Sequence, residues 1–265
     1  MELIFFGGKY MIANYHTHTP RCNHAKGTEE EYVQAALKRG SKILGFSDHT
    51  PYFFPDGYYS NFRMRPHQLQ DYTDSVLAVR GKYADQIDIH CGLEAEYYPK
   101  YFPELLAFLR NSPVEYLILG QHFVDNEINS AYSGSLTDNE EVLIKYCYQV
   151  MDAMNTGLFS YFAHPDILHF AGDLKKFEKY MRLVCKEAKS CHIPLEINLL
   201  GLRDSRHYPN GSFWRIAAEE GCLAIIGSDA HSPQALLDYA DEEKAIELAK
   251  RYEIEIIQRL DLRHV

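Results

Sequence analysis

Histidine and carboxylate side chains recur in this sequence where short apolar runs end. The first run is followed by His16 and His18, and the last is followed by Asp229 and His231. In an extended strand, residues i and i+2 point to the same side, so each pair can grip one cation. Imidazole and carboxylate ligands without thiolate suit Zn, Mn or Fe. One such pair is weak evidence by itself, so the metal hypothesis depends on the other runs.

Five further apolar runs end in the same kinds of polar residue, namely His49, Glu94, His122, His164 and Asn198. With His16 at the start and Asp229 at the end, successive positions lie 28 to 45 residues apart. A strand–helix–strand unit takes roughly 30 residues to return to the same edge of a sheet. The spacing therefore predicts that these side chains form one ring at one end of one barrel.

The elements that would position this ring alternate along the chain. We expect strands at 11–15, 42–46, 87–93, 116–119, 160–163, 195–199 and 223–226, because these runs are short and rich in β-branched or aromatic residues. We expect helices at 28–40, 66–83, 103–109, 138–154, 173–191, 211–220 and 242–251. Thr28 and Glu31 form a capping-box pattern. The alternation predicts an α/β fold, a distorted seven-stranded (β/α)7 barrel with its metal site at the C-terminal ends of the strands.

The motifs HTHTPRCNH, SDH, GLE, GQH, AHP and SDAH occur in this order. They resemble the polymerase-and-histidinol-phosphatase (PHP) family of metal-dependent phosphoesterases from Met11 onward. The resemblance implies three divalent metal ions, Zn, Mn or Fe. It assigns the first metal to His16, His18, Glu94 and Asp229; the second to Glu94, His122 and His164; and the third to His24, His49 and His231.

The segments EINLLGLR, YPNGSFW and TPRCNHA resemble the histidinol-phosphate phosphatase branch of that family. The resemblance implies hydrolysis of L-histidinol phosphate to L-histidinol and phosphate, a step of histidine biosynthesis. We expect attack by a hydroxide that bridges two metals. Asp229 and His231 are candidate catalytic residues that protonate the leaving group, beside metal-bound water. Arg203 is the first candidate for binding the substrate phosphate, and Arg63 is the second.

Other functions stay open at this point. An amidohydrolase-type enzyme also opens with His-x-His, but it usually needs a lysine where this chain has Gln121 and His122. A nuclease or tyrosine phosphatase of the PHP family is a second alternative, and a non-catalytic metal-holding module is a third. The net charge of −10 disfavours a nucleic-acid partner, which would require a basic face. We therefore expect a small-molecule phosphate monoester as the partner.

The 265 residues suit a single barrel domain at 11–265. Residues 1–10 are expected to be an N-terminal extension, either natural or added, since Met11 could also serve as a start. No apolar stretch is long enough to span a membrane, and six scattered cysteines are typical of a reduced, cytoplasmic protein. Among polar residues outside the ring, we expect Asp48 to orient an imidazole, Glu96 to be surface charge or a substrate contact, and His90 to face a helix.

Overall fold

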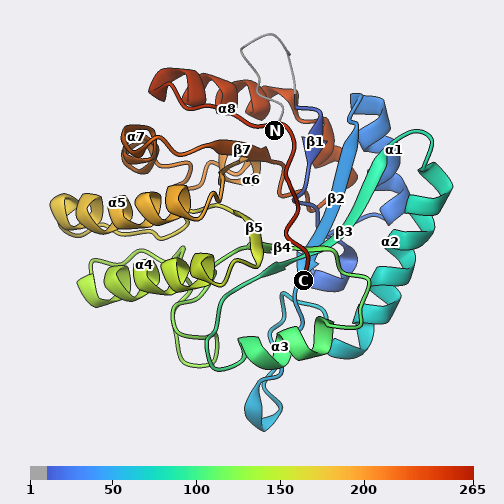
Figure 1. Ribbon diagram of the computed structural model, residues 1–265, viewed down its shortest axis with the longest axis horizontal. Helices are drawn as coiled ribbons and strands as arrows, with labels where there is room; N and C mark the ends of the chain where they lie inside the picture. The colour runs from blue at the N-terminus through green and yellow to red at the C-terminus, as the bar shows by residue number, and fades with distance from the viewer. Residues whose placement is uncertain (1–10) are drawn as a thin grey trace.

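Seven parallel strands form one sheet whose spatial order is the chain order (Figure 1). The computed structural model describes residues 11–265, so the predicted extension at 1–10 lies outside the described residues. The strands are β1 (Ala13–Asn14), β2 (Ile43–His49), β3 (Asp88–Ala95), β4 (Tyr116–Leu119), β5 (Phe159–Phe162), β6 (Leu195–Asn198) and β7 (Ala224–Gly227). Beyond β1 and β7, Thr17 and Ala230 form a parallel bridge that closes the sheet. The predicted distorted seven-stranded barrel is confirmed.

Helices surround the barrel and connect its strands (Figure 1). They are α1 (Glu29–Arg39), α2 (Leu69–Tyr83), α3 (Phe102–Leu109), α4 (Glu140–Asn155), α5 (Leu174–Ser190), α6 (Leu199–Arg203), α7 (Gly211–Glu220) and α8 (Tyr239–Tyr252). The capping box of Thr28 and Glu31 is present at the start of α1. Gly40 ends this helix at φ 88°, a left-handed conformation that glycine adopts without steric cost.

The expected strand at 195–199 is one residue too long, and the sequence reading missed helix α6 directly after it. Asn198 is the last residue of β6. Its side-chain oxygen accepts a hydrogen bond from the Gly201 N–H at 3.0 Å and so caps α6. An asparagine at this position satisfies one of the free N–H groups of the first turn. A short apolar run such as Leu199–Leu202 fits a strand or a helix equally well, and only the cap distinguishes them.

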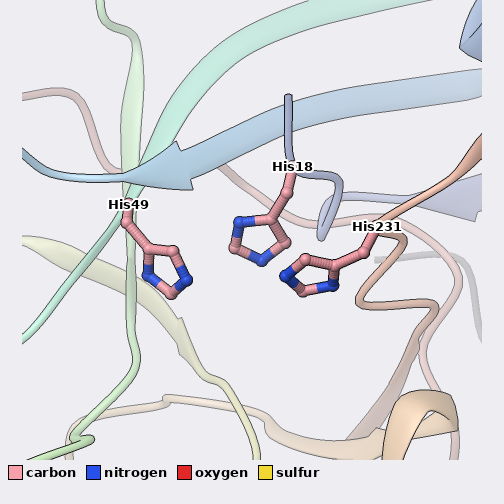
Figure 2. A group of neighbouring side chains, drawn as sticks. All are labelled: His18, His49 and His231. Carbon is pink, nitrogen blue, oxygen red and sulfur yellow. The ribbon is translucent and has the colours of Figure 1, made fainter. Parts of the chain in front are cut away.

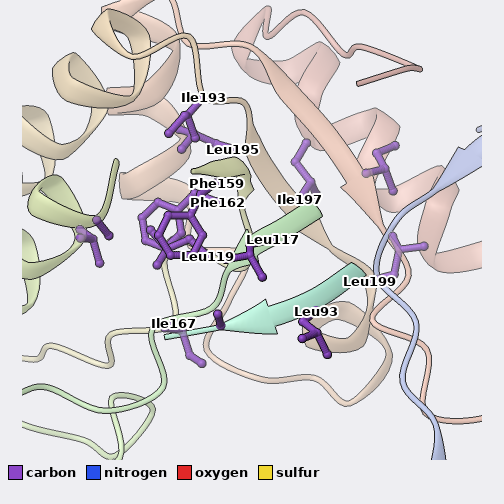
Figure 3. Packing of buried hydrophobic residues seen from close by; sticks show 14 of the residues in the cluster. Leu93, Leu117, Leu119, Phe159, Phe162, Ile167, Ile193, Leu195, Ile197 and Leu199 are labelled. Carbon is purple, nitrogen blue, oxygen red and sulfur yellow. The ribbon is translucent and has the colours of Figure 1, made fainter. Parts of the chain in front are cut away.

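Alternate residues of the strands face two different hydrophobic clusters. The larger cluster fills the space between strands and helices, and Figure 3 shows Leu117, Phe162 and Ile197 within it. The smaller cluster lies inside the barrel and includes Tyr15 and Tyr116. This packing fixes the register of each strand, because a slip by one residue would exchange the two faces. It therefore also fixes which side chains point into the barrel at the strand ends.

The prediction that His90 faces a helix is wrong. His90 lies four residues before Glu94 on β3, so both side chains point to the barrel interior, with the His90 ring 6.2 Å from that of Tyr15. The C-terminal segment closes this end of the barrel. The Leu260 N–H donates to the Tyr15 hydroxyl at 3.3 Å, and the Arg263 N–H donates to Ser160 Oγ at 3.0 Å. Figure 1 shows this segment running across the strands.

No helix in the part of the chain from residue 11 onward is long and apolar enough to cross a membrane.

Candidate metal centre

The nine side chains that the sequence singles out as metal ligands lie together beyond the C-terminal ends of the strands. Glu94, near the end of β3, is at the middle of this group and is 1% exposed. Five imidazoles face its carboxylate at N–O distances of 2.8 Å for His164, 3.0 Å for His49, 3.5 Å for His122 and 3.6 Å for both His16 and His18. The strand spacing thus brings residues 148 positions apart, from 16 to 164, to one carboxylate.

Asp229 approaches the same group from the other side. Its Oδ1 lies 3.2 Å from His18 Nε2, 3.3 Å from His231 Nδ1 and 3.6 Å from His16 Nε2. The His16 and His18 imidazoles therefore lie between two carboxylates, those of Glu94 and Asp229. Asp229 has φ 46° and His164 has φ 32°, values that are uncommon outside glycine. Strained backbone of this kind clusters at functional sites, where the surrounding structure holds it in place.

The histidines from three other segments form a second part of the group. Figure 2 shows His18, His49 and His231 directed into one space. The rings of His18 and His231 stack with centroids 4.1 Å apart. His24 completes this part, with its Nε2 only 2.9 Å from Nε2 of His231. Two imidazole nitrogens so close together must share either a proton or a cation.

Several buried atoms of the cluster have no hydrogen-bond partner among the described residues. These atoms are His16 Nε2, His18 Nε2, His49 Nδ1, His164 Nδ1, Glu94 Oε2 and Asp229 Oδ1. Leaving a buried polar atom without a hydrogen-bond partner costs about 1–3 kcal/mol, so natural proteins rarely leave several such atoms close together. Each of these atoms except His164 Nδ1 faces an imidazole nitrogen or a carboxylate oxygen of the same cluster. The donor set therefore fits divalent cations, which prefer these nitrogen and oxygen ligands.

Carboxylates behind three of the imidazoles fix their orientation. Glu196 Oε1 lies 2.8 Å from His16 Nδ1, and Glu96 Oε1 lies 2.9 Å from His122 Nδ1. Asp48 Oδ1 lies 3.4 Å from His18 Nδ1, which is the orienting contact expected for it. A carboxylate that accepts a hydrogen bond from Nδ1 leaves the Nε2 lone pair free for a metal. Glu96 is fully buried, so the expectation that it is surface charge or a substrate contact is wrong.

Burial and neighbouring charges raise the pKa of some of these imidazoles and lower the pKa of others. Burial would lower the pKa of His16, but Glu196, Asp229 and Glu94 outweigh it and raise this pKa well above its usual value. Likewise, burial is outweighed at His18, where hydrogen bonds to Asp229 and Asp48 raise the pKa to about 9. Burial lowers the pKa of His231 well below its usual value, and the positive charge of His18 lowers it further. The carboxylates around His16 and His18 therefore favour a positive charge at these two imidazoles, which either a proton or a neighbouring cation can supply.

Two glycines at strand ends leave room for the carboxylates. A Cβ on Gly120 would lie 1.9 Å from Glu94 Oε1, and a Cβ on Gly227 would lie 1.7 Å from Glu196 Oε1. Both carboxylates are fully packed, so neither can move aside without breaking its contacts with the imidazoles.

We expect Gly120→Ala to displace Glu94, to lower zinc content and to reduce the free energy of unfolding by about 1–3 kcal/mol. Urea denaturation and metal analysis would measure both effects. Gly81→Ala is the matched control, because a Cβ on this helical glycine meets nothing within 4 Å. It should stabilise the protein by up to about 1 kcal/mol. Wild-type zinc content in Gly120→Ala would contradict the crowding argument.

Glu196 connects three of the predicted ligands. Besides His16, it accepts a hydrogen bond through Oε2 from the His164 backbone N–H at 3.0 Å. The same Oε2 accepts from Asn198 Nδ2 at 2.9 Å, and Asn198 Nδ2 also donates to Asp229 at 3.1 Å. Asn198 was the predicted ring residue of this strand, and no role was predicted for Glu196, although the two residues share one face of β6.

We expect Glu196→Gln to weaken zinc binding about ten- to a hundredfold. An amide has one acceptor oxygen and a donor NH2 group, so it cannot accept from both His16 and His164. A competition titration against a chromophoric chelator would measure the change. Glu104→Gln makes the same substitution on the exposed face of α3 and should leave the affinity unchanged. Equal affinities in the two variants would show that Glu196 does not support the cluster.

A cavity of about 450 Å³ opens above the cluster and leads outward. Glu94, Asp229 and five of the histidines named above are at its floor, and an aromatic wall and a short polar loop form its sides. The loop follows α6 and contributes Asp204, Arg206 and Tyr208. No role was predicted for Arg206, although it lies within the DSRH segment between EINLLGLR and YPNGSFW, because the turn that directs it depends on helix α6, which was not predicted.

The two arginines predicted to bind phosphate are not among the described residues that line this cavity. Arg63 is 1% exposed and forms ion pairs with Glu96 and Glu127, so its guanidinium is already neutralised. Arg203 donates from its Nη2 to the backbone carbonyls of Ser228 and Asp229 at 3.2 and 3.4 Å. Both side chains hold loops of the site in place.

This chain is similar in sequence and fold to known proteins. The PHP domain family model matches residues 14–199. A Deinococcus radiodurans protein named probable histidinol-phosphatase is 32% identical over 247 residues, covering 89% of this chain and 92% of that protein. A Schizosaccharomyces pombe protein of the same name is 26% identical, covering 86% and 84%. The structure of histidinol phosphate phosphatase from Lactococcus lactis, complexed with zinc, L-histidinol and phosphate, has a TM-score of 0.74 at 19% identity and covers 95% of this chain and 99% of that one. The family model and the Deinococcus relative show that this chain belongs to the PHP domain family.

Proposed function

We propose that this protein is a metal-dependent phosphomonoesterase that hydrolyses L-histidinol phosphate to L-histidinol and phosphate, a step of histidine biosynthesis. The observation that carries the proposal is the convergence of unpartnered imidazole and carboxylate atoms on the floor of an open cavity. The names of the Deinococcus and fission-yeast relatives support this substrate, and so do the ligands in the Lactococcus structure.

The proposed ligand sets are those that the resemblance to the PHP family implies. One cation would be held by His16, His18, Glu94 and Asp229; a second by Glu94, His122 and His164; and a third by His24, His49 and His231. Bound there, divalent cations would neutralise the phosphoryl oxygens and supply hydroxide near neutral pH. The oxygen of the attacking water would then bond to phosphorus while the bond between phosphorus and the ester oxygen breaks. The ester oxygen, which leaves with L-histidinol, would take up a proton.

Asp229 and His231 both line the cavity and are the proposed carriers of that proton. Burial alone would raise the pKa of Asp229, but the neighbouring His16 and His18 imidazoles hold it well below its usual value. The carboxylate form is therefore favoured at Asp229, so this residue would hold a proton only briefly while the proton passes from the attacking water to the leaving oxygen. His231 lies 3.3 Å from Asp229 Oδ1 and can take part in the same transfer.

Arg206 is the proposed substrate-facing arginine in place of Arg63 and Arg203. It lines the cavity, and its Nη1 donates to the Tyr208 hydroxyl at 3.0 Å. A guanidinium fixed in this way presents its remaining N–H groups to phosphate oxygens as a planar fork. The cavity volume also suits a small molecule, since such sites typically measure about 300–1,000 Å³.

A phosphate-release assay tests this function. We expect kcat/KM for L-histidinol phosphate to exceed that for phenyl phosphate, phosphotyrosine and a 5′-nucleotide by at least about tenfold. Zinc, manganese and iron are measured in the same preparation. Equal rates for all esters would reduce the proposal to a PHP phosphoesterase of another substrate. No phosphate release from metal-loaded protein would contradict it altogether.

A further inference from the structure

The cavity above the metal-ligand cluster has two chemically unlike walls. One wall is aromatic: Phe62 stacks on Phe123 with ring centroids 5.8 Å apart, and Phe123 lies 5.8 Å from Tyr132. The other wall is the polar loop after α6, which contributes Asp204 and Arg206. Such a cavity suits a ligand that has a planar group facing one wall and a charged group facing the other.

Asp204 and Arg206 form an ion pair at the surface of this wall. Arg206 Nη2 donates to Asp204 Oδ2 at 3.0 Å, and the two side chains are 37% and 46% exposed, respectively. Exposed pairs contribute little to stability and separate easily when a better partner arrives. The second amino group of Arg206 is anchored to Tyr208, which is 2% exposed and lies 6.2 Å from the His164 ring. Arg206 is thereby held near the cluster, where a phosphate group would bind.

The carboxylates that line the cavity, among the described residues, are Glu94, Asp229 and Asp204. Glu94 and Asp229 are surrounded by imidazoles and lie on the floor. Asp204 is therefore the carboxylate that can meet the part of a substrate that points away from the phosphate. When the phosphate draws Arg206 toward the floor, the Asp204 charge loses its partner and becomes available to a cation.

We infer that Asp204 is a specificity-determining residue that recognises a cationic group on the organic part of the phosphate monoester. In this arrangement the Asp204–Arg206 pair separates across a zwitterionic substrate, so that Arg206 faces the phosphate and Asp204 faces the ammonium or imidazolium group. The aromatic wall packs against the planar portion of the same substrate. The inference rests on the proposed phosphomonoesterase function and adds the feature that separates cationic from neutral and anionic esters.

Three substrates of different charge test this role: L-histidinol phosphate, phenyl phosphate and 4-carboxyphenyl phosphate. We expect Asp204→Asn to lower the kcat/KM of the cationic ester relative to phenyl phosphate about ten- to a hundredfold, mainly through KM. Asp204→Lys should reverse the order of the cationic and anionic esters. A variant that had only lost structural integrity would hydrolyse all three esters more slowly and would not reverse their order. Asp85→Asn makes the same change of charge on an exposed turn before β3, at the opposite end of the barrel, and should leave all ratios at wild-type values.

The possible outcomes separate this inference from the proposed function. If Asp204→Asn slows all three esters by the same factor, Asp204 has only a structural role in the loop and the inference is overturned. Unchanged ratios in both Asp204 variants overturn it as well, while phosphatase activity in the wild type leaves the proposed function intact. If the wild-type, metal-loaded protein hydrolyses none of the three esters, the proposed function fails first.

Discussion

Glu94→Gln is expected to lower kcat for phosphate ester hydrolysis by about a thousandfold. Five imidazoles face the Glu94 carboxylate within 3.6 Å, and no other side chain of the cluster contacts as many of them. An amide carries no charge and has one acceptor oxygen, so it would hold divalent cations less tightly than the carboxylate and would not balance their charge. The loss of about 4 kcal/mol of transition-state stabilisation corresponds to the expected factor.

Steady-state kinetics combined with metal analysis would measure this effect. The Glu94→Gln protein should retain less than its full complement of metal, and excess zinc should restore little of the activity. Glu104→Gln, on the exposed face of α3, is the matched control and should keep wild-type kinetics. If Glu94→Gln retained more than a tenth of the wild-type kcat, the Glu94 carboxylate would not be needed to hold metal at the reacting centre.

Removal of metal is expected to lower the melting temperature by roughly 5–10 °C. A ligand present at a hundred times its Kd stabilises the folded state by about 2.7 kcal/mol. For a chain of this size, each kcal/mol corresponds to roughly 2–4 °C. The physical reason lies in the buried carboxylates of Glu94, Asp229, Glu196 and Asp48, whose charge would be balanced only by protonated histidines in the metal-free protein.

Thermal denaturation before and after treatment with a chelator would measure this shift, and addition of zinc should reverse it. The Glu94→Gln variant provides an internal comparison, because a protein that binds less metal should lose less stability when the chelator is added. An identical melting temperature with and without chelator would mean that the cluster holds no metal that matters for folding.

The sequence was sufficient to predict the barrel and the convergence of the cluster, because both depend on regular features of the chain. Strand periodicity fixes which side chains point inward, and the spacing of strand–helix units brings their ends to one side. His16 and Asp229, which are 213 residues apart, could be paired for this reason.

The features that the sequence did not reveal depend on contacts between neighbouring strands and loops. Glu196 lies behind His16 because β6 and β1 are close in the closed barrel, and no pattern within β6 indicates this. Arg63 was predicted to bind substrate, yet it is enclosed by Glu96 and Glu127 from two other segments. Arg206 reaches the cavity only because α6 turns the chain. The charge and type of such a residue predict that its side chain makes polar contacts. They do not predict which residue is its partner.

The C-terminal segment that crosses the far end of the barrel has a kinetic consequence. Among the described residues, Leu260 and Arg263 hold the C-terminal segment over that end, whereas the cavity opens at the opposite end, so we expect substrate and products to pass through this opening. In the proposed function, the alcohol would lie nearer this opening than the inorganic phosphate, so we expect the alcohol to leave first. Phosphate should accordingly be a competitive product inhibitor, whereas the alcohol should inhibit noncompetitively, and initial-rate measurements with each product added would reveal this order of release.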